Sequence, residues 1–159
     1  MKLCFIVDAR SPTARSWIGH FTRAGHEVHV ISTYPCGPDA VPGASLDVVP
    51  VAFSMLAGGS TGGAGRSTGP RPSIGRLLAG VPLGSLWSQF SRLRHWLGPL
   101  DVYRHTPRVR KIVARIGPDL VHAMRVPFEG LLAAEALRQA DTPLLISIWG
   151  NDFSYHADR

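Results

Sequence analysis

Apolar and polar positions alternate along this chain in blocks that predict strands and helices in turn. Short, mostly apolar segments predict strands at residues 2–8, 26–32, 46–51, 119–124 and 143–149. Between several of them, apolar residues recur at helical spacing, which predicts amphipathic helices. Alternating strands and helices are typical of a doubly wound, mostly parallel sheet. The pattern therefore predicts an α/β, Rossmann-like fold.

The first helix has clear boundary signals. Ser11 is expected at the N-cap and Pro12 at the first helical position, where a missing N–H costs nothing. Trp17 and Ile18 begin the apolar positions of this helix, and Gly25 should end it in a left-handed conformation. The helix should therefore connect the first two strands.

The middle of the chain predicts two further helices and a loop. Residues 57–75 are mostly Gly, Ser, Thr, Pro and Arg, a composition that predicts a mobile loop. Separate helices are expected at residues 86–97 and 102–116, and Pro107 must lie early in the second helix or break it. A last helix should begin at Pro127 and run through residue 140. The fifth strand, residues 143–149, follows it and should be a buried parallel strand.

Bulk composition fits one globular domain. The chain has 159 residues, of which 45% are hydrophobic and 18% charged. Its two cysteines, Cys4 and Cys36, cannot form a disulfide framework, so a reduced cytoplasmic protein is expected. Because the sequence contains no run of 18 apolar residues, we expect no membrane span.

The net charge of +6 comes mainly from one region. Residues 66–115 hold ten Lys and Arg residues against one acid, Asp101. Such a patch can attract nucleic acid, anionic lipid or phosphorylated ligands. However, fifteen of the seventeen basic residues are arginine, and a general Arg-for-Lys preference weakens this inference. The amphipathic segment 86–97 could lie on a membrane surface, or it could pack on the sheet as an ordinary helix.

Candidate chemistry should lie after the strands, because ligands of open α/β sheets bind outside the carboxyl ends of the strands. The first such loop, Ala9, Arg10 and Ser11, leads into a helix N-terminus. Free backbone N–H groups and the helix dipole suit a phosphate there. A simple strand-to-helix turn is the alternative.

The second loop follows the fourth strand. His122 could hydrogen-bond a hydroxyl or exchange a proton near neutral pH, and Arg125 could bind a phosphate or carboxylate. The alternative for His122 is a satisfied histidine in the core.

The third loop follows the fifth strand. Gly150 permits a tight turn, while Asn151 and Asp152 offer donors and acceptors for sugar hydroxyls. The indole of Trp149 could stack on a sugar face. Alternatively, Asn151 and Asp152 cap a following helix, and Trp149 belongs to the core. No cysteine or histidine spacing predicts a metal site.

Taken together, residues 15–31, 118–123, 129–130 and 147–153 resemble the N-terminal domain of GT-B glycosyltransferases of family 4, the group 1 transferases. The Gly-His-Glu-Val motif from Gly25 is common to many Rossmann-like proteins. Its combination with Pro-Asp-Leu-Val-His-Ala and Trp-Gly-Asn-Asp is more specific.

The resemblance implies two facing Rossmann-like domains, a nucleotide-sugar donor, retention at the anomeric carbon and no metal or other cofactor. The N-terminal domain would mainly hold the acceptor. By carry-over, residues 9–11 would face the donor phosphates, His122 the transferred sugar, and Arg125 with residues 151–152 the acceptor. His122 and Asp152 are then the candidate catalytic residues, and Arg15 a further substrate-binding candidate.

Two features depart from the family pattern. The first loop lacks the Gly-Gly pair common in the family, and residues 1–159 contain only one predicted domain. We therefore expect a truncated, acceptor-side domain that is inactive alone and lacks its C-terminal donor domain. Its substrates would be a nucleotide sugar and a sugar or lipid-linked acceptor, met in the cytoplasm or at the inner face of the membrane.

Two rival functions remain open at this point. One is a non-enzymatic Rossmann-like binding module that docks on a partner chain. The other is a basic protein that binds nucleic acid or a membrane surface. Under the transferase hypothesis, nucleic acid is not an expected partner.

Overall fold

The computed structural model describes residues 1–51, 54 and 83–149. The loop predicted at 57–75 and the site candidates Gly150, Asn151 and Asp152 lie outside the described residues, as do the side chains of the segment 86–97.

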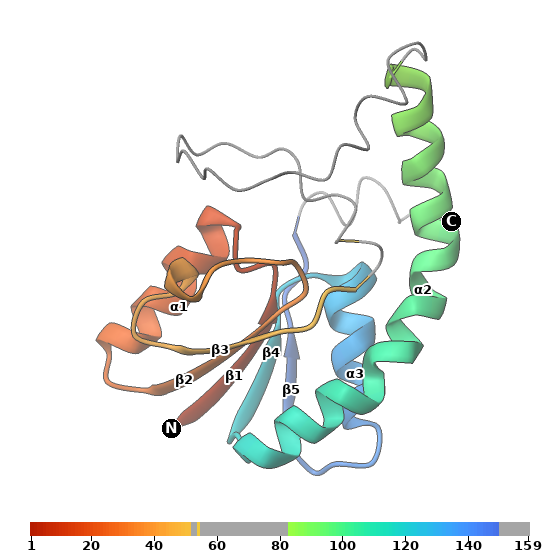
Figure 1. Cartoon of the computed structure of the whole chain (residues 1–159). Helices are drawn as coiled ribbons and strands as arrows, with labels where there is room; N and C mark the ends of the chain where they lie inside the picture. The colour runs from red at the N-terminus through yellow and green to blue at the C-terminus, as the bar shows by residue number, and fades with distance from the viewer. Residues whose placement is uncertain (52–53, 55–82, 150–159) are drawn as a thin grey trace.

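Five parallel strands of the described chain form one sheet in the order β3-β2-β1-β4-β5 (Figure 1). Their bounds are β1 Lys2–Val7, β2 Glu27–Ser32, β3 Ser45–Val48, β4 Leu120–Ala123 and β5 Leu144–Ile146. The chain therefore runs outward from β1 to one edge and then returns to build the other half. The predicted α/β, Rossmann-like fold is confirmed.

Helices cover both faces of the sheet. Helix α1 (Pro12–Arg23) packs on the face that carries Phe5 and Val30, whereas α2 (Leu83–Ile116) and α3 (Leu131–Leu137) pack on the face that carries Cys4 and Ile6. Successive strand residues point to opposite faces, so each strand supplies both cores. Figure 1 shows the two helix layers.

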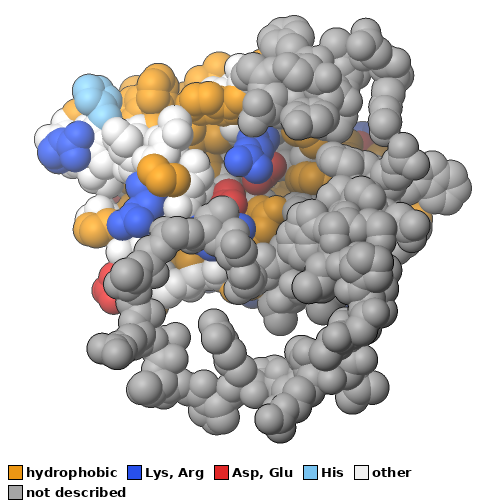
Figure 2. All heavy atoms as spheres, turned by 90° about the horizontal axis from the view of Figure 1, so that it is seen from above, with side chains coloured by type: hydrophobic (Ala, Val, Ile, Leu, Met, Phe, Trp, Pro, Cys, Tyr) orange, Lys and Arg blue, Asp and Glu red, His pale blue; other side chains and the backbone are white. Residues whose placement is uncertain are grey.

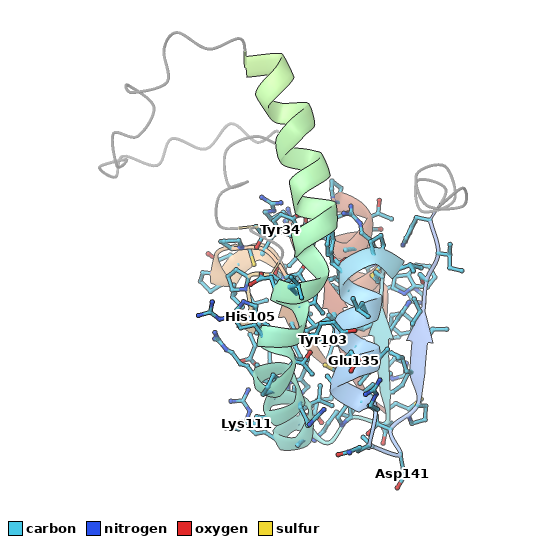
Figure 3. All side chains as sticks on the ribbon, turned by 90° about the vertical axis from the view of Figure 1, so that its right-hand side faces the viewer. Tyr34, Tyr103, His105, Lys111, Glu135 and Asp141 are labelled. Carbon is cyan, nitrogen blue, oxygen red and sulfur yellow. The ribbon has the colours of Figure 1, made fainter. Side chains whose placement is uncertain are left out.

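Helices α2 and α3 lie side by side, as Figure 3 shows with Tyr103 and Lys111 on α2 and Glu135 on α3. The Arg110 guanidinium joins them by donating to the backbone carbonyls of Glu135 and Ala136 at 3.1 and 3.2 Å. These carbonyls belong to the last turn of α3, where a cation is favourable.

The boundaries of α1 follow the predicted signals. Ser11 is the N-cap residue, Pro12 is the first helical residue and Gly25 adopts a left-handed φ of 81°. In the described structure the Ser11 side chain makes no capping hydrogen bond. The capping position was thus predicted correctly, but the hydroxyl does not fill its usual role.

The prediction of two helices at 86–97 and 102–116 was wrong, because α2 is one helix of 34 residues. Pro107 lies within it and removes one backbone donor, which bends a helix without necessarily ending it. Figure 1 shows α2 bent. Thr106 Oγ1 donates to the Val102 carbonyl at 3.1 Å, and Val109 and Val113 are buried beyond the proline. Packing on the sheet therefore outweighs the lost hydrogen bond.

The helix predicted from Pro127 to residue 140 begins differently. A π-helical turn, η3 (Val126–Gly130), precedes α3, and the Gly130 N–H donates to the Arg125 carbonyl at 2.7 Å. A β-carbon added at Gly130 would lie 2.8 Å from that carbonyl oxygen. The wider turn therefore depends on the missing side chain, a device often found at functional sites.

The third and fifth strands are shorter than predicted. β3 ends at Val48, before Pro50, which cannot donate to a ladder. β5 contains three residues at the edge of the described sheet, with Leu145 47% and Ile146 37% exposed. The expectation of a buried strand was wrong there, because within the described residues β5 pairs only with β4.

Candidate functional site

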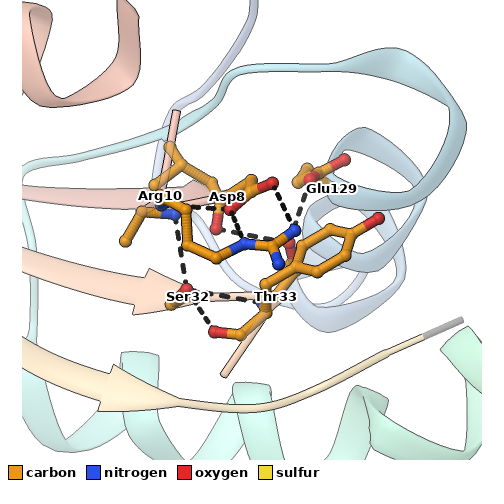
Figure 4. Close-up of polar contacts among 8 residues, drawn as sticks. Asp8, Arg10, Ser32, Thr33 and Glu129 are labelled. Atoms are coloured by element: carbon orange, nitrogen blue, oxygen red, sulfur yellow. Dashed lines mark hydrogen bonds and ion pairs between the residues drawn. The ribbon is translucent and has the colours of Figure 1, made fainter. Parts of the chain in front are cut away.

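Polar residues from three segments meet at the carboxyl edge of the sheet. Parallel strands end at the same edge, so the residues after β1 and β2 become neighbours, and η3 enters beside them. We call this group the rim network; it consists of Asp8, Arg10, Ser32, Thr33, Tyr34 and Glu129 (Figure 4). Figure 2 looks onto this side of the molecule and shows acidic and basic side chains together between apolar ones.

Arg10 is held in place on two sides. Its Nε and one terminal nitrogen donate to the two Asp8 carboxylate oxygens at 3.0 and 3.2 Å. Its guanidinium carbon also lies 4.0 Å from the centre of the Tyr34 ring, a cation–π contact. Fork-like pairs of this kind fix orientation as well as charge. Arg10 therefore has a defined position, and its side chain is 28% exposed to solvent.

The backbone N–H groups of residues 9–11 are used inside the protein. The Ala9 N–H donates to Ser32 Oγ at 3.3 Å, the Arg10 N–H to Asp8 Oδ1 at 3.0 Å, and the Ser11 N–H to the Asp8 carbonyl at 3.0 Å. The expectation of free N–H groups therefore fails for the loop itself. An anion at this edge would meet the Arg10 side chain and the first turn of α1.

The segment Ser32–Tyr34 supports this loop from the second strand. Ser32 Oγ donates to the Tyr34 carbonyl at 2.7 Å while accepting from Ala9. The Thr33 N–H donates to the Val7 carbonyl at 2.8 Å, and Thr33 Oγ1 lies 3.3 Å from the same oxygen. One short segment thus holds both the end of β1 and the loop that follows.

Glu129 is buried, although glutamate is usually charged and exposed. Only 2% of Glu129 is exposed, and Thr33 Oγ1 lies 2.9 Å from Glu129 Oε1. Within the described structure, Glu129 Oε2 is buried without a hydrogen-bond partner. Burial raises the pKa of Glu129, and the nearby charge of Arg125 opposes this effect in part. The carboxyl is therefore biased toward its neutral form.

His122 lies on β4, the neighbour of β1 in the sheet, and its imidazole ring lies among aromatic side chains. The ring centres of Phe5 and Trp17 are 5.4 and 6.3 Å from that of His122. Its Nε2 lies 2.7 Å from Ser147 Oγ. Burial lowers the pKa of His122, which favours the neutral imidazole. Because Trp17 is 45% exposed, this cluster combines a buried histidine with an accessible indole.

The predicted site residues fall into distinct places. Ala9 and Arg10 lie in or against the rim network, and Ser11 begins α1. His122 is grouped with Phe5, Trp17 and Ser147 in the described contacts, so Arg10 and His122 share an edge of the sheet but belong to different clusters.

Three further candidates have exposed side chains. Arg15 lies on α1, Arg125 lies at the start of η3, and Trp149 follows β5. Of these, Arg125 acts electrostatically on Glu129, which places it close to the rim network.

Several residues of these clusters were not predicted as site residues. Ser32 ends a predicted strand, and Thr33 and Tyr34 follow it, so the rule that selected the other loops would have found this segment. Ser147 was hidden within the predicted fifth strand. Glu129 entered only as part of a Glu-Gly pair, because a glutamate inside a predicted helix gives no sign of burial.

The described part of the chain contains no group of three His, Cys, Asp or Glu residues able to hold a metal ion. Among the helices described, none has both the length and the apolar character needed to cross a membrane.

Comparison with known proteins assigns the chain to a family. The glycosyl transferase 4-like domain family matches residues 11–159, which include four of the five strands. Asp8 and Arg10 of the rim network and Phe5 beside His122 precede the matched residues. A search of curated proteins found no match. The chain belongs to the glycosyl transferase 4-like domain family of glycosyltransferases.

Proposed function

We propose that this chain is the acceptor-side domain of a retaining glycosyltransferase that uses a nucleotide sugar and no metal ion. The observation that carries the proposal is the family match over residues 11–159. The two polar clusters at the carboxyl edge support it, because this edge is where open α/β sheets bind ligands. The donor-binding half would be supplied from outside these residues.

Arg10 is the proposed contact for the donor phosphates. A guanidinium already fixed by Asp8 and Tyr34 loses little side-chain freedom when it binds an oxyanion. The positive end of the α1 dipole lies next to it in the chain and would add to the attraction. Stabilisation of the departing diphosphate would need further cations from the donor half.

His122 is the proposed contact for the transferred sugar. A neutral imidazole beside the Ser147 hydroxyl can donate to or accept from a sugar hydroxyl. Trp17 offers an exposed aromatic face next to it. The acceptor side would be formed by Arg125 and Trp149, together with residues 150–152, and Arg15 would contribute from α1. Asp152 is the second proposed catalytic residue.

Sugar binding to the 159-residue chain tests the assignment of His122 and its neighbours to the transferred sugar. Methyl glycosides of glucose, galactose, mannose and N-acetylglucosamine would be titrated while the backbone and indole N–H signals are followed by NMR. At least one sugar should shift the Trp17 indole and Ser147 signals in a saturable way. The variant His122→Ala should weaken this response, whereas Glu27→Gln, on an exposed residue away from the cluster, should not.

A transfer assay tests the placement of the donor half. UDP-, GDP- and ADP-sugars would be incubated with the chain and the sugar that it binds best. We expect no glycosylated product, because the cations that stabilise the diphosphate are assigned to a donor-binding half outside residues 1–159. Sustained turnover by the chain alone would contradict that assignment, and the absence of any saturable sugar response would contradict the sugar-binding role of His122.

A further inference from the structure

We propose that Glu129 is a positioning residue of the rim network, held as a neutral carboxylic acid that donates a hydrogen bond to Thr33 and thereby fixes the segment on which Arg10 rests. The inference deepens the proposed function and rests on it for the ligand that Arg10 would bind. The state of Glu129 itself can be tested without any sugar or nucleotide.

The hydrogen-bond geometry around Thr33 supports a protonated Glu129. Thr33 Oγ1 has one proton and two neighbours that can accept it, the Val7 carbonyl at 3.3 Å and Glu129 Oε1 at 2.9 Å. If Glu129 carries a proton on Oε1, it donates to Thr33 Oγ1, and Thr33 in turn donates to Val7. A neutral acid satisfies both contacts in one chain.

The surroundings of the second carboxyl oxygen point the same way. Glu129 Oε2 is buried without a partner among the described residues. Leaving a charged oxygen in that state costs more than leaving the carbonyl oxygen of a neutral acid, because a buried charge needs pairing and hydrogen bonds. Burial, the largest effect, and the charge of Asp8 favour the neutral form of Glu129. The charge of Arg125 and hydrogen bonds from the Glu129 backbone and from Thr33 favour the ionised form. Arg125 is exposed, so solvent weakens its effect.

Thr33 connects Glu129 to the site. It is the central residue of Ser32–Tyr34, whose neighbours hold Ala9 through the Ser32 hydroxyl and Arg10 through the Tyr34 ring. Any displacement of Thr33 therefore moves both supports of the Arg10 loop. Figure 4 shows Arg10, Thr33 and Glu129 close together at this edge.

The glutamates of the chain make the test direct. There are only three, Glu27, Glu129 and Glu135, so selective carbon-13 labelling of glutamate gives three side-chain carboxyl signals. The variant Glu129→Gln assigns one of them. Glu27 is the reference for the ionised form, because its hydrogen bond to His29 lowers its pKa and it is exposed. At neutral pH, the Glu129 signal should have the chemical shift of a protonated acid.

Two variants separate a proton-donating role from simple filling of space. Glutamine keeps the shape and can donate to Thr33, so Glu129→Gln should leave the Arg10 Nε–H and Tyr34 ring signals within the wild-type range. Glu129→Ala should shift both signals, because Thr33 loses its partner. Glu27→Gln is the matched control and should shift neither of them.

An ionised Glu129 at neutral pH would overturn the inference. So would a Glu129→Gln variant that displaces the Arg10 signal by as much as Glu129→Ala does. If Glu129→Ala does not fold, the wild-type carboxyl signal and the glutamine variant still decide the question. Because no ligand enters these measurements, failure here is distinct from failure to bind a sugar.

Discussion

Replacing Gly130 by alanine should destabilise the protein, although alanine is the better helix former. Gly130 ends the π-helical turn with ordinary right-handed dihedral angles, φ −66° and ψ −45°, so backbone strain does not require glycine. The obstacle is space. The new β-carbon would lie 2.8 Å from the Arg125 carbonyl oxygen and 3.3 Å from Ile146 Cγ2. The first of these atoms belongs to the backbone and cannot move without disturbing the turn.

The expected change in the free energy of unfolding combines two costs and one gain. Overpacking of this kind costs about 1–3 kcal/mol. Disturbing the 2.7 Å hydrogen bond from the Gly130 N–H to the Arg125 carbonyl adds roughly 1 kcal/mol. The gain in helix propensity offsets about 1 kcal/mol. The free energy of unfolding should therefore fall by about 1–3 kcal/mol, and each kcal/mol lowers the melting temperature by roughly 2–4 °C at this chain length.

Gly19 provides the matched control. It lies inside α1, where an added β-carbon would meet only the far end of the flexible Arg23 side chain, at 3.1 Å. Gly19→Ala should thus stabilise the protein by up to about 1 kcal/mol. Thermal unfolding of both variants, followed by circular dichroism with urea unfolding as a second measurement, should give opposite signs.

A Gly130→Ala variant as stable as the wild type would refute this reasoning. It would mean that η3 converts to an ordinary α-helical turn without cost, so that the turn does not fix Glu129 in position. A loss in both variants would instead show that helix propensity is a poor guide here, and the steric argument would lose its control.

The remaining predictions concern two cysteines and one histidine. Burial raises the pKa of Cys4 to about 12, so Cys4 should resist thiol reagents in the folded protein while the half-buried Cys36 reacts first; equal labelling rates would contradict this. Burial lowers the pKa of His122, so its contribution to stability is present above the unfolded pKa and is lost as pH falls through the folded pKa. In the variant His122→Gln, the free energy of unfolding should therefore fall less steeply toward acid pH. An unchanged pH dependence would contradict this prediction. Ser147→Ala should alter the His122 tautomer seen by nitrogen-15 NMR, because it removes the hydroxyl 2.7 Å from Nε2.

The strands and the first helix were predictable because their signals are local. The apolar runs place β1, β2 and β4 within about two residues of their observed bounds, and Ser11, Pro12 and Gly25 mark the ends of α1. The short length and exposure of β5 were not predictable, because an apolar run does not show whether a further strand pairs with it. Its exposure depends on its position at the edge of the described sheet.

Proline was overweighted as a helix breaker. Pro107 predicts a boundary from local sequence, yet α2 continues through it and buries Val109, Ile112, Val113 and Ile116 against the sheet. A proline inside a helix costs about 3 kcal/mol, because it removes a hydrogen bond and its ring clashes with a backbone carbonyl. Each buried aliphatic side chain contributes about 1.5–3 kcal/mol. Four such side chains therefore exceed the cost.

The position of the candidate site follows from a general rule, but its contacts do not. The rule that ligands bind at the carboxyl edge selects the loops after β1 and β4, and ligand binding there stays a prediction. It does not show that Asp8 would bind Arg10, or that His122 would face Trp17 and Ser147. Those contacts depend on rotamers and on which sheet face each strand residue occupies. Glu129 was hidden for a further reason: the π-helical turn shifts it relative to the helix that the pattern predicts.

The loop after β1 shows how side chains can replace the glycines that the family resemblance leads one to expect. Asp8 closes the turn by accepting from the Ser11 and Arg10 backbone N–H groups, and Ser32 takes the Ala9 N–H. A loop with a Gly-Gly pair can offer its bare backbone to a phosphate, whereas here that backbone is already hydrogen-bonded. Under the proposed function, an anion would then meet the Arg10 guanidinium and the first turn of α1. Because side chains hold this loop, we infer that the position of Arg10 depends on Tyr34, on Thr33 and finally on Glu129. A loop built in this way gives the buried acid on η3 a role that a glycine loop would not require.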